Sequence, residues 1–316
     1  MKVVVTGGAG FIGANLCLEL VHRGAHVVVL DDLSTGQQSN LDGIDVELCV
    51  GSVLDRDALM NACRAADSVV HLAAVPSVPR SLQDPRRSHD VNVTGTLEVL
   101  EAARAAGAHV VVASSSSVYG RNPVLPKSEE MPCWPISPYG SSKLAAESYA
   151  LSFQHCFDLP CAVFRFFNVF GPFQRPAHPY AAVVPSFVWA ALRREPLVVF
   201  GDGKQSRDFT FVGSVVEVLA DCVTRAVNCA HPVNLAFGTR TSLNDLIGML
   251  SALLGRELDV VHRPARDGDV RHSQASWNAL RGLFPSVRPV SLEAALCRTV
   301  EWMERLVTPE PSRSTA

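Results

Sequence analysis

The chain has 316 residues, of which 47% are apolar. Its 28 Lys and Arg residues nearly balance 31 Asp and Glu residues, for a formal net charge of −3. This composition allows one large domain or two smaller ones around a sizeable core, without a basic footprint for nucleic acid or membrane surfaces. No apolar run reaches the roughly 18 residues that a membrane span needs.

The first half of the sequence alternates short β-branched runs with segments of helical apolar spacing. Strands that are apolar throughout, alternating with helices, indicate a parallel sheet covered on both faces, a doubly wound Rossmann-like α/β fold. Gly24 and Gly107 follow two of the helical segments, where they are suited to C-terminal capping. The expected strands are 3–6, 27–30, 46–50, 68–72, 110–114 and 161–166.

The alternation ends after Asn168, where several prolines interrupt the pattern. We therefore predict a doubly wound domain at 1–167, a smaller, partly interleaved α/β domain at 168–307 and a flexible tail at 308–316. The nine cysteines form no Cys-x-x-Cys pair, and the N-terminus is unlike a signal peptide, so we expect reduced thiols and a cytoplasmic location. The histidines show no metal-ligand spacing, so no metal is expected, and 127–130 is interpreted as a solvated loop.

A glycine-rich turn follows the first strand. The run Gly7-Gly8-Ala9-Gly10-Phe11-Ile12-Gly13 can be interpreted as Gly-x-Gly-x-x-Gly from Gly8 or as Gly-x-x-Gly-x-x-Gly from Gly7. Such glycines permit a sharp turn, close approach of the backbone to a pyrophosphate and tight helix packing. The helix that follows directs free N–H groups at the phosphates. A dinucleotide site is the prediction.

Asp31 and Asp32 stand at the end of the second expected strand. A carboxylate in this place accepts hydrogen bonds from the adenosine ribose hydroxyls and repels a 2′-phosphate. The sequence therefore predicts NAD as the cofactor, in preference to NADP.

The segment Ser137-Pro138-Tyr139-Gly140-Ser141-Ser142-Lys143 has the features of a helix start, with Ser137 as the cap and Pro138 at the first position. Tyr139 and Lys143 then lie one turn apart on one face. An ammonium beside the phenol, together with the charge of an oxidised nicotinamide, would lower the phenol pKa and make it a base. A serine run, 114–117, ends the expected strand 110–114, at the sheet edge where ligands bind.

These motifs together resemble the extended short-chain dehydrogenase/reductases of the nucleotide-sugar epimerase/dehydratase branch, and most of all the NAD-dependent UDP-hexose 4-epimerases. Further matching motifs are His71-Leu72-Ala73-Ala74, Asn92-Val93-Thr94-Gly95-Thr96 and Arg165-Phe166-Phe167-Asn168-Val169-Phe170-Gly171-Pro172, with 201–210 and 266–273 after them. They span nearly the whole chain in the family's order.

The resemblance implies a catalytic set of Ser115, Tyr139 and Lys143, with Ser117 as a supporting hydroxyl. One departure is Ser52, where the family usually has an Asp that contacts the adenine, so that contact is weaker or absent here. The residues implied to bind NAD are Gly7, Gly10, Phe11, Ile12, Gly13, Asp31, Asp32, Ser52, Val53, Leu72, Ala73, Ala74, Asn92, Tyr139, Lys143 and Phe166.

The resemblance also implies a UDP-sugar substrate and a homodimer formed through 93–106 and 139–156. Arg207 and Arg266 would pair with phosphates, as a guanidinium does well, Asp269 with the ribose, and Val198 and Phe200 with the uracil. The residues implied to bind substrate are Arg80, Ser115, Ser116, Ser117, Asn168, Val183, Val198, Phe200, Arg207, Arg266, Asp269 and Ser273.

The serines after Ser115 indicate the reaction. Related dehydratases carry Asp-Glu at the positions of Ser116 and Ser117, because water elimination needs an acid and a base. An all-hydroxyl site is typical of an epimerase, which moves a hydride off C4 and back through a 4-keto sugar and retains its NAD. A 4-keto reductase and a non-catalytic NAD-binding sensor stay open as alternatives.

Ser273 bears on the identity of the sugar. In the 4-epimerases, the position four after the one that matches Asp269 lies beside the C2 substituent, where a Tyr confines the enzyme to a C2 hydroxyl. The small Ser273 leaves room for an N-acetyl group, so UDP-N-acetylglucosamine is the expected substrate, with UDP-glucose possible. UDP-glucuronate is the third option, although enzymes acting on it commonly have Thr at the position of Asn168.

Overall fold

A computed structural model describes residues 1–176, 181–265 and 271–307. Its centre is a seven-stranded sheet in the order β11-β6-β5-β4-β1-β2-β3, with every neighbouring pair parallel. This confirms the doubly wound Rossmann-like fold. The strands are β1 (Lys2–Thr6), β2 (His26–Asp31), β3 (Val46–Val50), β4 (Ser68–His71), β5 (His109–Ser115), β6 (Cys161–Phe166) and β11 (Val233–Leu235).

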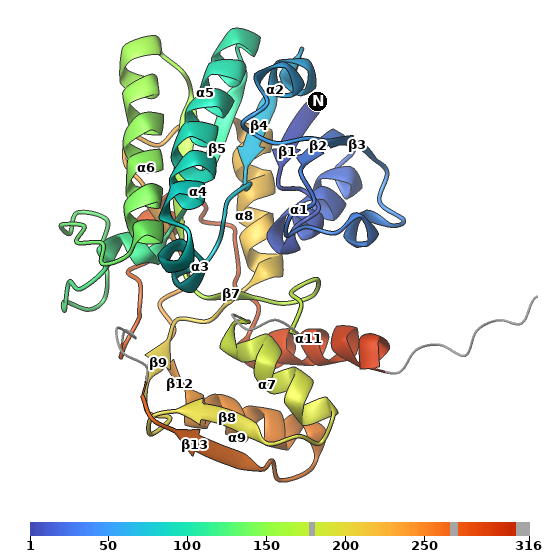
Figure 1. Cartoon of the computed structure of the whole chain (residues 1–316), viewed down its shortest axis with the longest axis vertical. Coiled ribbons are helices and arrows are strands. Elements are labelled where there is room, and N and C mark those ends of the chain that lie inside the picture. Colours follow the sequence, from blue (N-terminus) through green and yellow to red (C-terminus); the bar gives the residue numbers. More distant parts are fainter. Residues whose placement is uncertain (177–180, 266–270, 308–316) are drawn as a thin grey trace, which may run out of the picture.

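Helices cover both faces of the sheet (Figure 1). Successive strand residues point to opposite faces, so Val3 and Val5 belong to one hydrophobic cluster and Val4 to another. The first cluster includes side chains of α1 (Phe11–His22) and α8 (Val212–Arg225). The second includes side chains of α2 (Arg56–Cys63), α5 (Gly95–Ala106) and α6 (Pro138–Phe157).

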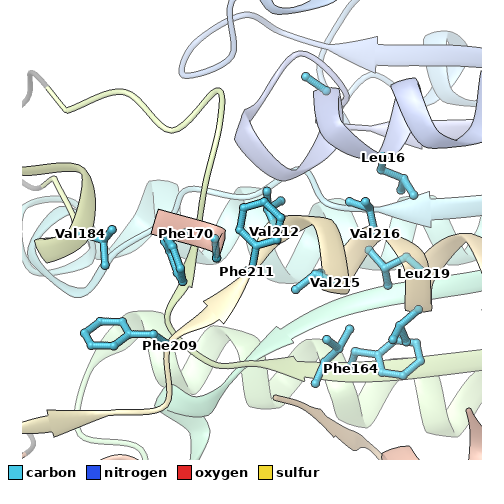
Figure 2. Close-up of a cluster of buried hydrophobic side chains, with 14 of the residues drawn as sticks. Leu16, Phe164, Phe170, Val184, Phe209, Phe211, Val212, Val215, Val216 and Leu219 are labelled. Atoms are coloured by element: carbon cyan, nitrogen blue, oxygen red, sulfur yellow. The ribbon is translucent and has the colours of Figure 1, made fainter. Parts of the chain in front are cut away.

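The first cluster continues beyond the sheet into the C-terminal part of the chain. Figure 2 shows Leu16 beside Val216, Phe211 beside Phe170, and Val184 further along the same cluster. One continuous apolar core therefore joins the sheet to the C-terminal part of the chain.

The C-terminal part lies at one end of the molecule, while α8 and β11 return to the sheet (Figure 1). This crossing is the kind of interleaving that the sequence predicts, and the boundary at 167 stays a prediction. The expected tail, 308–316, lies outside the described residues. The elements here are β7 (Val169–Phe170), α7 (Val183–Leu192), β8 (Leu197–Phe200), β9 (Ser206–Arg207), β10 (Thr210–Phe211), β12 (Thr241–Ser242), α9 (Leu243–Leu254), β13 (Val260–Arg263), α10 (Asn278–Leu283) and α11 (Leu292–Val307).

Helix ends follow the residues that the sequence analysis singled out. Gly24 and Gly107 have φ values of +78° and +67°, the left-handed conformation that glycine adopts freely after a helix. Ser137 caps α6, since its hydroxyl accepts a 3.1 Å hydrogen bond from the Gly140 N–H. Tyr139 and Lys143 therefore lie in the first turns of a well-defined helix.

The helix expected around 93–106 has a less regular start. A π-helical turn, Asp90–Thr94, separates α4 (Pro85–His89) from α5, and α3 (Val78–Gln83) precedes both. Such turns are frequent at functional sites. Here the turn carries Asn92, whose side chain accepts from the Val75 N–H at 2.8 Å and donates to the Ser142 hydroxyl at 3.0 Å.

The interpretation of 127–130 as a solvated loop is wrong. Lys127 is buried, and its ammonium donates to the Asn122 carbonyl oxygen. Glu129 accepts a 2.9 Å hydrogen bond from the Asn234 N–H on β11. Charged residues indicate a solvated loop only when no other segment packs against them. Asn234, the partner of Glu129, is more than a hundred residues away in the sequence.

No helix within 1–176, 181–265 and 271–307 is long and apolar enough to cross a membrane. The same residues contain no cluster of three or more side chains suited to hold a metal ion.

Candidate active site

A cavity of about 810 Å³ lies at the carboxyl ends of the central strands. β1 and β4 are neighbours there although β2 and β3 come between them in the sequence, and ligands of open α/β sheets bind where the strand order reverses in this way. Of the residues predicted to bind NAD or substrate, the cavity brings together Gly7, Gly10, Phe11, Ile12, Gly13, Asp31, Asp32, Ser52, Val53, Leu72, Ala73, Ala74, Arg80, Tyr139, Lys143 and Phe166.

The glycine turn forms a cradle at the start of α1. Gly7 has a φ of +72°, and a Cβ on Gly13 would lie 2.2 Å from the Gly7 carbonyl oxygen, so neither position accepts a side chain. Gly8 instead faces Val29, away from the cavity. The pattern that lines the cavity is therefore Gly7-x-x-Gly10-x-x-Gly13. The first turn of α1 holds no acidic residue and Gly10 caps it without a side chain, which suits a pyrophosphate.

Asp31 is held rigidly at the cavity wall. Its carboxylate accepts hydrogen bonds from the Ala9 N–H at 2.9 Å and the Leu33 N–H at 2.8 Å. Burial raises the pKa of Asp31 above its usual range, and the two N–H groups oppose that rise. The Ser52 hydroxyl accepts from the Leu54 N–H at 3.1 Å, and its weaker adenine contact stays a prediction.

Lys143 and Tyr139 occupy the wall formed by α6. The Lys143 ammonium donates a 2.9 Å hydrogen bond to the Ala113 carbonyl oxygen on β5, and burial lowers its pKa to about 8. Burial raises the pKa of Tyr139, while a hydrogen bond with Ser115 lowers it. In the chain without NAD, desolvation outweighs this hydrogen bond. The lowered phenol pKa that the sequence predicts beside an oxidised nicotinamide stays a prediction.

Only the first residue of the serine run, Ser114, lines the cavity. The Ser115 hydroxyl accepts a 3.1 Å hydrogen bond from the Ser117 N–H and lies 3.1 Å from the Ser117 hydroxyl. Neither these two residues nor Ser116 and Asn92 line the cavity, whereas Ser114 does. Asn92 instead fixes Val75, which lines the wall.

A second cavity of about 280 Å³ gathers five of the residues predicted to bind substrate, namely Asn168, Val183, Val198, Phe200 and Arg207. Ser273 does not line it, but its N–H donates to the carbonyl oxygen of Ser206, next to Arg207, at 3.0 Å. The predicted partners Arg266 and Asp269 lie outside the described residues.

Asp208, which the sequence analysis missed, lies between two residues that line this second cavity, Arg207 and Phe209. Its fully buried carboxylate accepts from the N–H groups of Gly238, Thr239 and Ala275 at 3.0–3.2 Å. The Asn168 amide donates to the Asp208 carbonyl oxygen at 3.2 Å. A single Asp after an Arg carries no pattern that could have identified it.

Two further residues of the first cavity were also missed. Ser77 has a φ of +82°, which is strained for a residue with a Cβ, and its buried hydroxyl has no hydrogen-bond partner among the described residues. Arg175 lines the same cavity as Tyr139. Neither stands in a motif, so only the folded chain shows their place.

Arg207 gives a testable consequence for the second cavity. Its guanidinium donates to the carbonyl oxygens of Ser206 and Arg271, at 3.0 and 3.2 Å, which hold it at the wall. Arg207→Ala should raise KM for a UDP-sugar by the equivalent of about 2–5 kcal/mol, because a buried phosphate charge loses its partner. Calorimetric titration with UDP measures the loss directly, and wild-type affinity for UDP would place the phosphates elsewhere.

The fold and this site define a class: a Rossmann-type enzyme that uses a dinucleotide cofactor, in which Tyr139 and Lys143 line the same cavity as the glycine turn.

Comparison with known proteins supports this class. The model of the NAD dependent epimerase/dehydratase family matches residues 3–236. The UDP-glucose 4-epimerase of Mycolicibacterium smegmatis is 38% identical over 312 residues, covering 96% of this chain and 98% of that protein. The chain therefore belongs to the NAD dependent epimerase/dehydratase family, which confirms the resemblance and the NAD cofactor.

Solved structures of two such enzymes have the same fold over nearly the whole chain. The UDP-N-acetylglucosamine 4-epimerase of Methanobrevibacter ruminantium M1 superposes with a TM-score of 0.90 at 35% identity, covering 96% of this chain and 97% of that one. The UDP-glucuronic acid 4-epimerase of Bacillus cereus, bound to UDP-glucuronic acid and NAD, has a TM-score of 0.89 at 28% identity, covering 97% and 100%.

Proposed function

We propose that this chain is a UDP-sugar 4-epimerase that interconverts UDP-N-acetylglucosamine and UDP-N-acetylgalactosamine, with the UDP-glucose and UDP-galactose pair slower or comparable. Relatives and similar structures named as UDP-sugar 4-epimerases support the reaction. The single observation that supports the N-acetylated sugar is the small side chain of Ser273. The Ser273 N–H donates to the carbonyl oxygen of Ser206, next to Arg207.

The residues of the first cavity and the serines next to it account for the chemistry of an epimerase. Tyr139 takes the proton of the sugar C4 hydroxyl and later returns it, with Ser115 bonded to the phenol. Lys143, fixed to the Ala113 carbonyl oxygen, stabilises the phenolate by its charge. When bound, NAD supplies the hydride acceptor and donor of the reaction. The hydroxyls of Ser116 and Ser117 provide no acid and base for water elimination.

Arg175 favours a second candidate substrate, UDP-glucuronate. Arg175 lines the cavity that Tyr139 lines, and a planar guanidinium binds a carboxylate through two hydrogen bonds. Asn168, where enzymes acting on UDP-glucuronate commonly have Thr, argues against this candidate.

An NMR time course without added NAD tests the proposal and its alternatives. The purified protein is incubated separately with UDP-N-acetylglucosamine, UDP-glucose and UDP-glucuronate. We expect the C4 isomer of the first to form fastest or at a rate comparable to the second. Turnover of UDP-glucuronate alone would replace the proposed substrate with the second candidate. No turnover of any sugar would favour a 4-keto reductase or a sensor.

The homodimer belongs to the same proposal. Tyr149 and Phe157 lie eight residues apart on α6, so they share one face, and their side chains are exposed in the single chain. Exposed aromatic residues on one helix face are typical of an interface. Light scattering should give about twice the 34.0 kDa mass of the chain, and a monomer would contradict it.

A further inference from the structure

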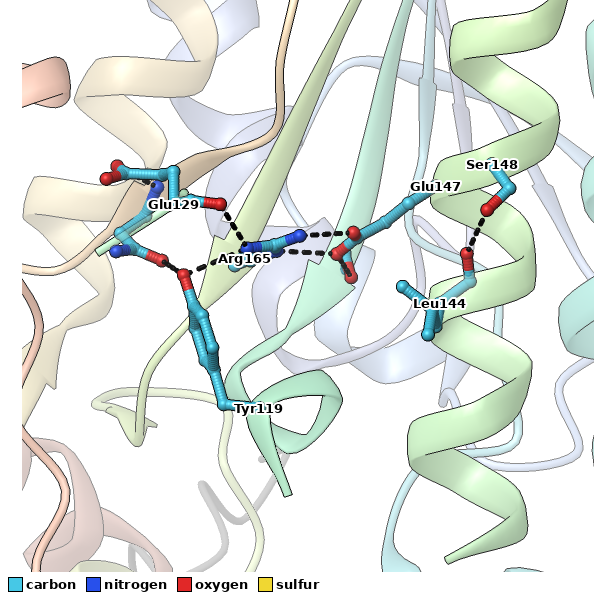
Figure 3. Close-up of polar contacts among 8 residues, drawn as sticks. Tyr119, Glu129, Leu144, Glu147, Ser148 and Arg165 are labelled. Atoms are coloured by element: carbon cyan, nitrogen blue, oxygen red, sulfur yellow. Dashed lines mark hydrogen bonds and ion pairs between the residues drawn. The ribbon is translucent and has the colours of Figure 1, made fainter. Parts of the chain in front are cut away.

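Behind the catalytic wall lies a buried ion pair that the proposed mechanism does not use. Glu147 on α6 and Arg165 on β6 form two hydrogen bonds, of 2.9 and 2.7 Å, and both side chains are at most 5% exposed. Arg165 also donates to the Tyr119 hydroxyl at 2.9 Å, and Tyr119 donates to Asn234 on β11 at 2.7 Å. Figure 3 shows Arg165 between Tyr119 and Glu147, in the space between α6 and the sheet.

This pair is joined to the catalytic residues through the end of β5. The Ser114 hydroxyl donates to the Glu147 carboxylate, and the carbonyl oxygen of the preceding residue, Ala113, accepts from the Lys143 ammonium. Two successive β5 residues are therefore attached to two α6 side chains one turn apart. Ser115, which bonds to Tyr139, follows directly on the same strand.

The charges around Lys143 can be assigned element by element. On α6 it has Tyr139 before it and Glu147 after it, and Glu147 raises the pKa of Lys143 against the effect of burial. On β4, burial lowers the pKa of His71 to about 3, so that imidazole is neutral. β5 contributes the Ala113 carbonyl oxygen, and Arg165 of β6 lies beyond Glu147. Among the residues that the structure describes, Glu147 is thus the carboxylate whose charge favours the ammonium form of Lys143.

We propose that Glu147 is a positioning residue of the active site: its carboxylate fixes the end of β5 through Ser114 and keeps Lys143 charged at neutral pH. Arg165 holds that carboxylate in place. The proposal rests on the proposed role of Lys143, but the ionisation of Lys143 can be measured without any substrate.

The decisive variant is Glu147→Gln, which keeps the side chain's shape and an oxygen for Ser114 but removes the charge. The protein has four lysines, so a 13Cε NMR titration of lysine-labelled protein resolves few signals, and Lys143→Arg assigns the one in question. We expect the pKa of Lys143 to fall by about one unit or more relative to wild type. An unchanged pKa in the folded variant would overturn the proposal. This titration is independent of which sugar the enzyme accepts.

Activity then tests the link to catalysis. Because the phenolate needs a charged Lys143, kcat should decline as pH rises through the pKa of Lys143. In Glu147→Gln this alkaline decline should move to lower pH by the same amount as the measured pKa. A lowered pKa with an unmoved kcat profile would show that Glu147 has no part in catalysis.

Two controls separate this role from a purely structural one. Glu147→Gln leaves Arg165 buried without a charge partner and can fail to fold, whereas Glu147→Gln/Arg165→Met removes both charges and should restore folding. The double variant should keep the lowered Lys143 pKa, and a wild-type pKa in it would overturn the proposal. Glu101→Gln, a matched change at a partly exposed glutamate that pairs with Arg104 at 2.6 Å, should leave the Lys143 pKa and the kcat profile unchanged.

Discussion

Replacing Tyr139 with Phe should lower kcat for 4-epimerisation by about 10²- to 10⁴-fold, the range that general acid–base groups contribute. The ring stays and only the ionisable oxygen is lost, so packing of the wall is retained. Ser115 cannot act as the base in place of Tyr139, because a serine hydroxyl is much less acidic than a phenol. Steady-state rates with the wild-type enzyme's best UDP-sugar measure the effect.

The cofactor content of the purified variant is the control for this prediction. Gly7 and Gly10 of the glycine cradle lie in the turn between β1 and α1, and Gly13 lies in the first turn of α1. The substitution of Tyr139 on α6 leaves all three unchanged, so Tyr139→Phe should retain NAD as wild type does. Turnover close to wild type in a variant that retains NAD would remove Tyr139 from its role as the base.

Most of the residues predicted to bind the cofactor line one cavity, and the sequence indicates this gathering because many of them are neighbours in the chain. The turn from Gly7 to Gly13 follows β1 directly and Asp31 is the last residue of β2, so the order of strand, turn and helix indicates their place. Even there, the choice between Gly7 and Gly8 needed the structure, since only the fold shows that Gly8 faces Val29.

The parts that the sequence did not predict depend on contacts between distant segments. Lys127 is buried and Glu129 is bonded to β11, although their local sequence resembles a solvated loop. Glu147 on α6 and Arg165 on β6 are 18 residues apart in the sequence, and Asp208 accepts from donors 30 or more residues further along. A pattern in one segment carries no information on such partners, because desolvation and pairing arise only when the segments pack.

The serine run shows a subtler limit. The sequence places a serine at the end of β5 correctly, but it does not show that Ser114 lines the cavity and bonds Glu147 while Ser115 bonds Tyr139. Successive strand residues face opposite sides, so neighbours in one run have different roles.

Ser273→Tyr should abolish turnover of the N-acetylated pair while sparing UDP-glucose and UDP-galactose. The argument is steric: a phenol ring in place of a hydroxymethyl group fills the volume that an N-acetyl group at C2 would occupy, and overpacking of a formed site is not relieved cheaply. Since Ser273 is tied by its backbone to Ser206, next to Arg207, the new ring starts from a fixed point.

The matched control for this variant is Ser273→Ala, which removes the hydroxyl without adding volume and should keep both activities. Rates for both sugar pairs are measured side by side, and UDP affinity confirms that the phosphate contacts persist. Equal loss of both activities in Ser273→Tyr would mean that the ring disturbs Arg207 or the fold instead of the C2 position. If the wild-type enzyme does not turn over N-acetylated sugars, the assignment of the N-acetylated substrate is also wrong. A small residue permits the larger sugar only where the rest of the pocket binds it.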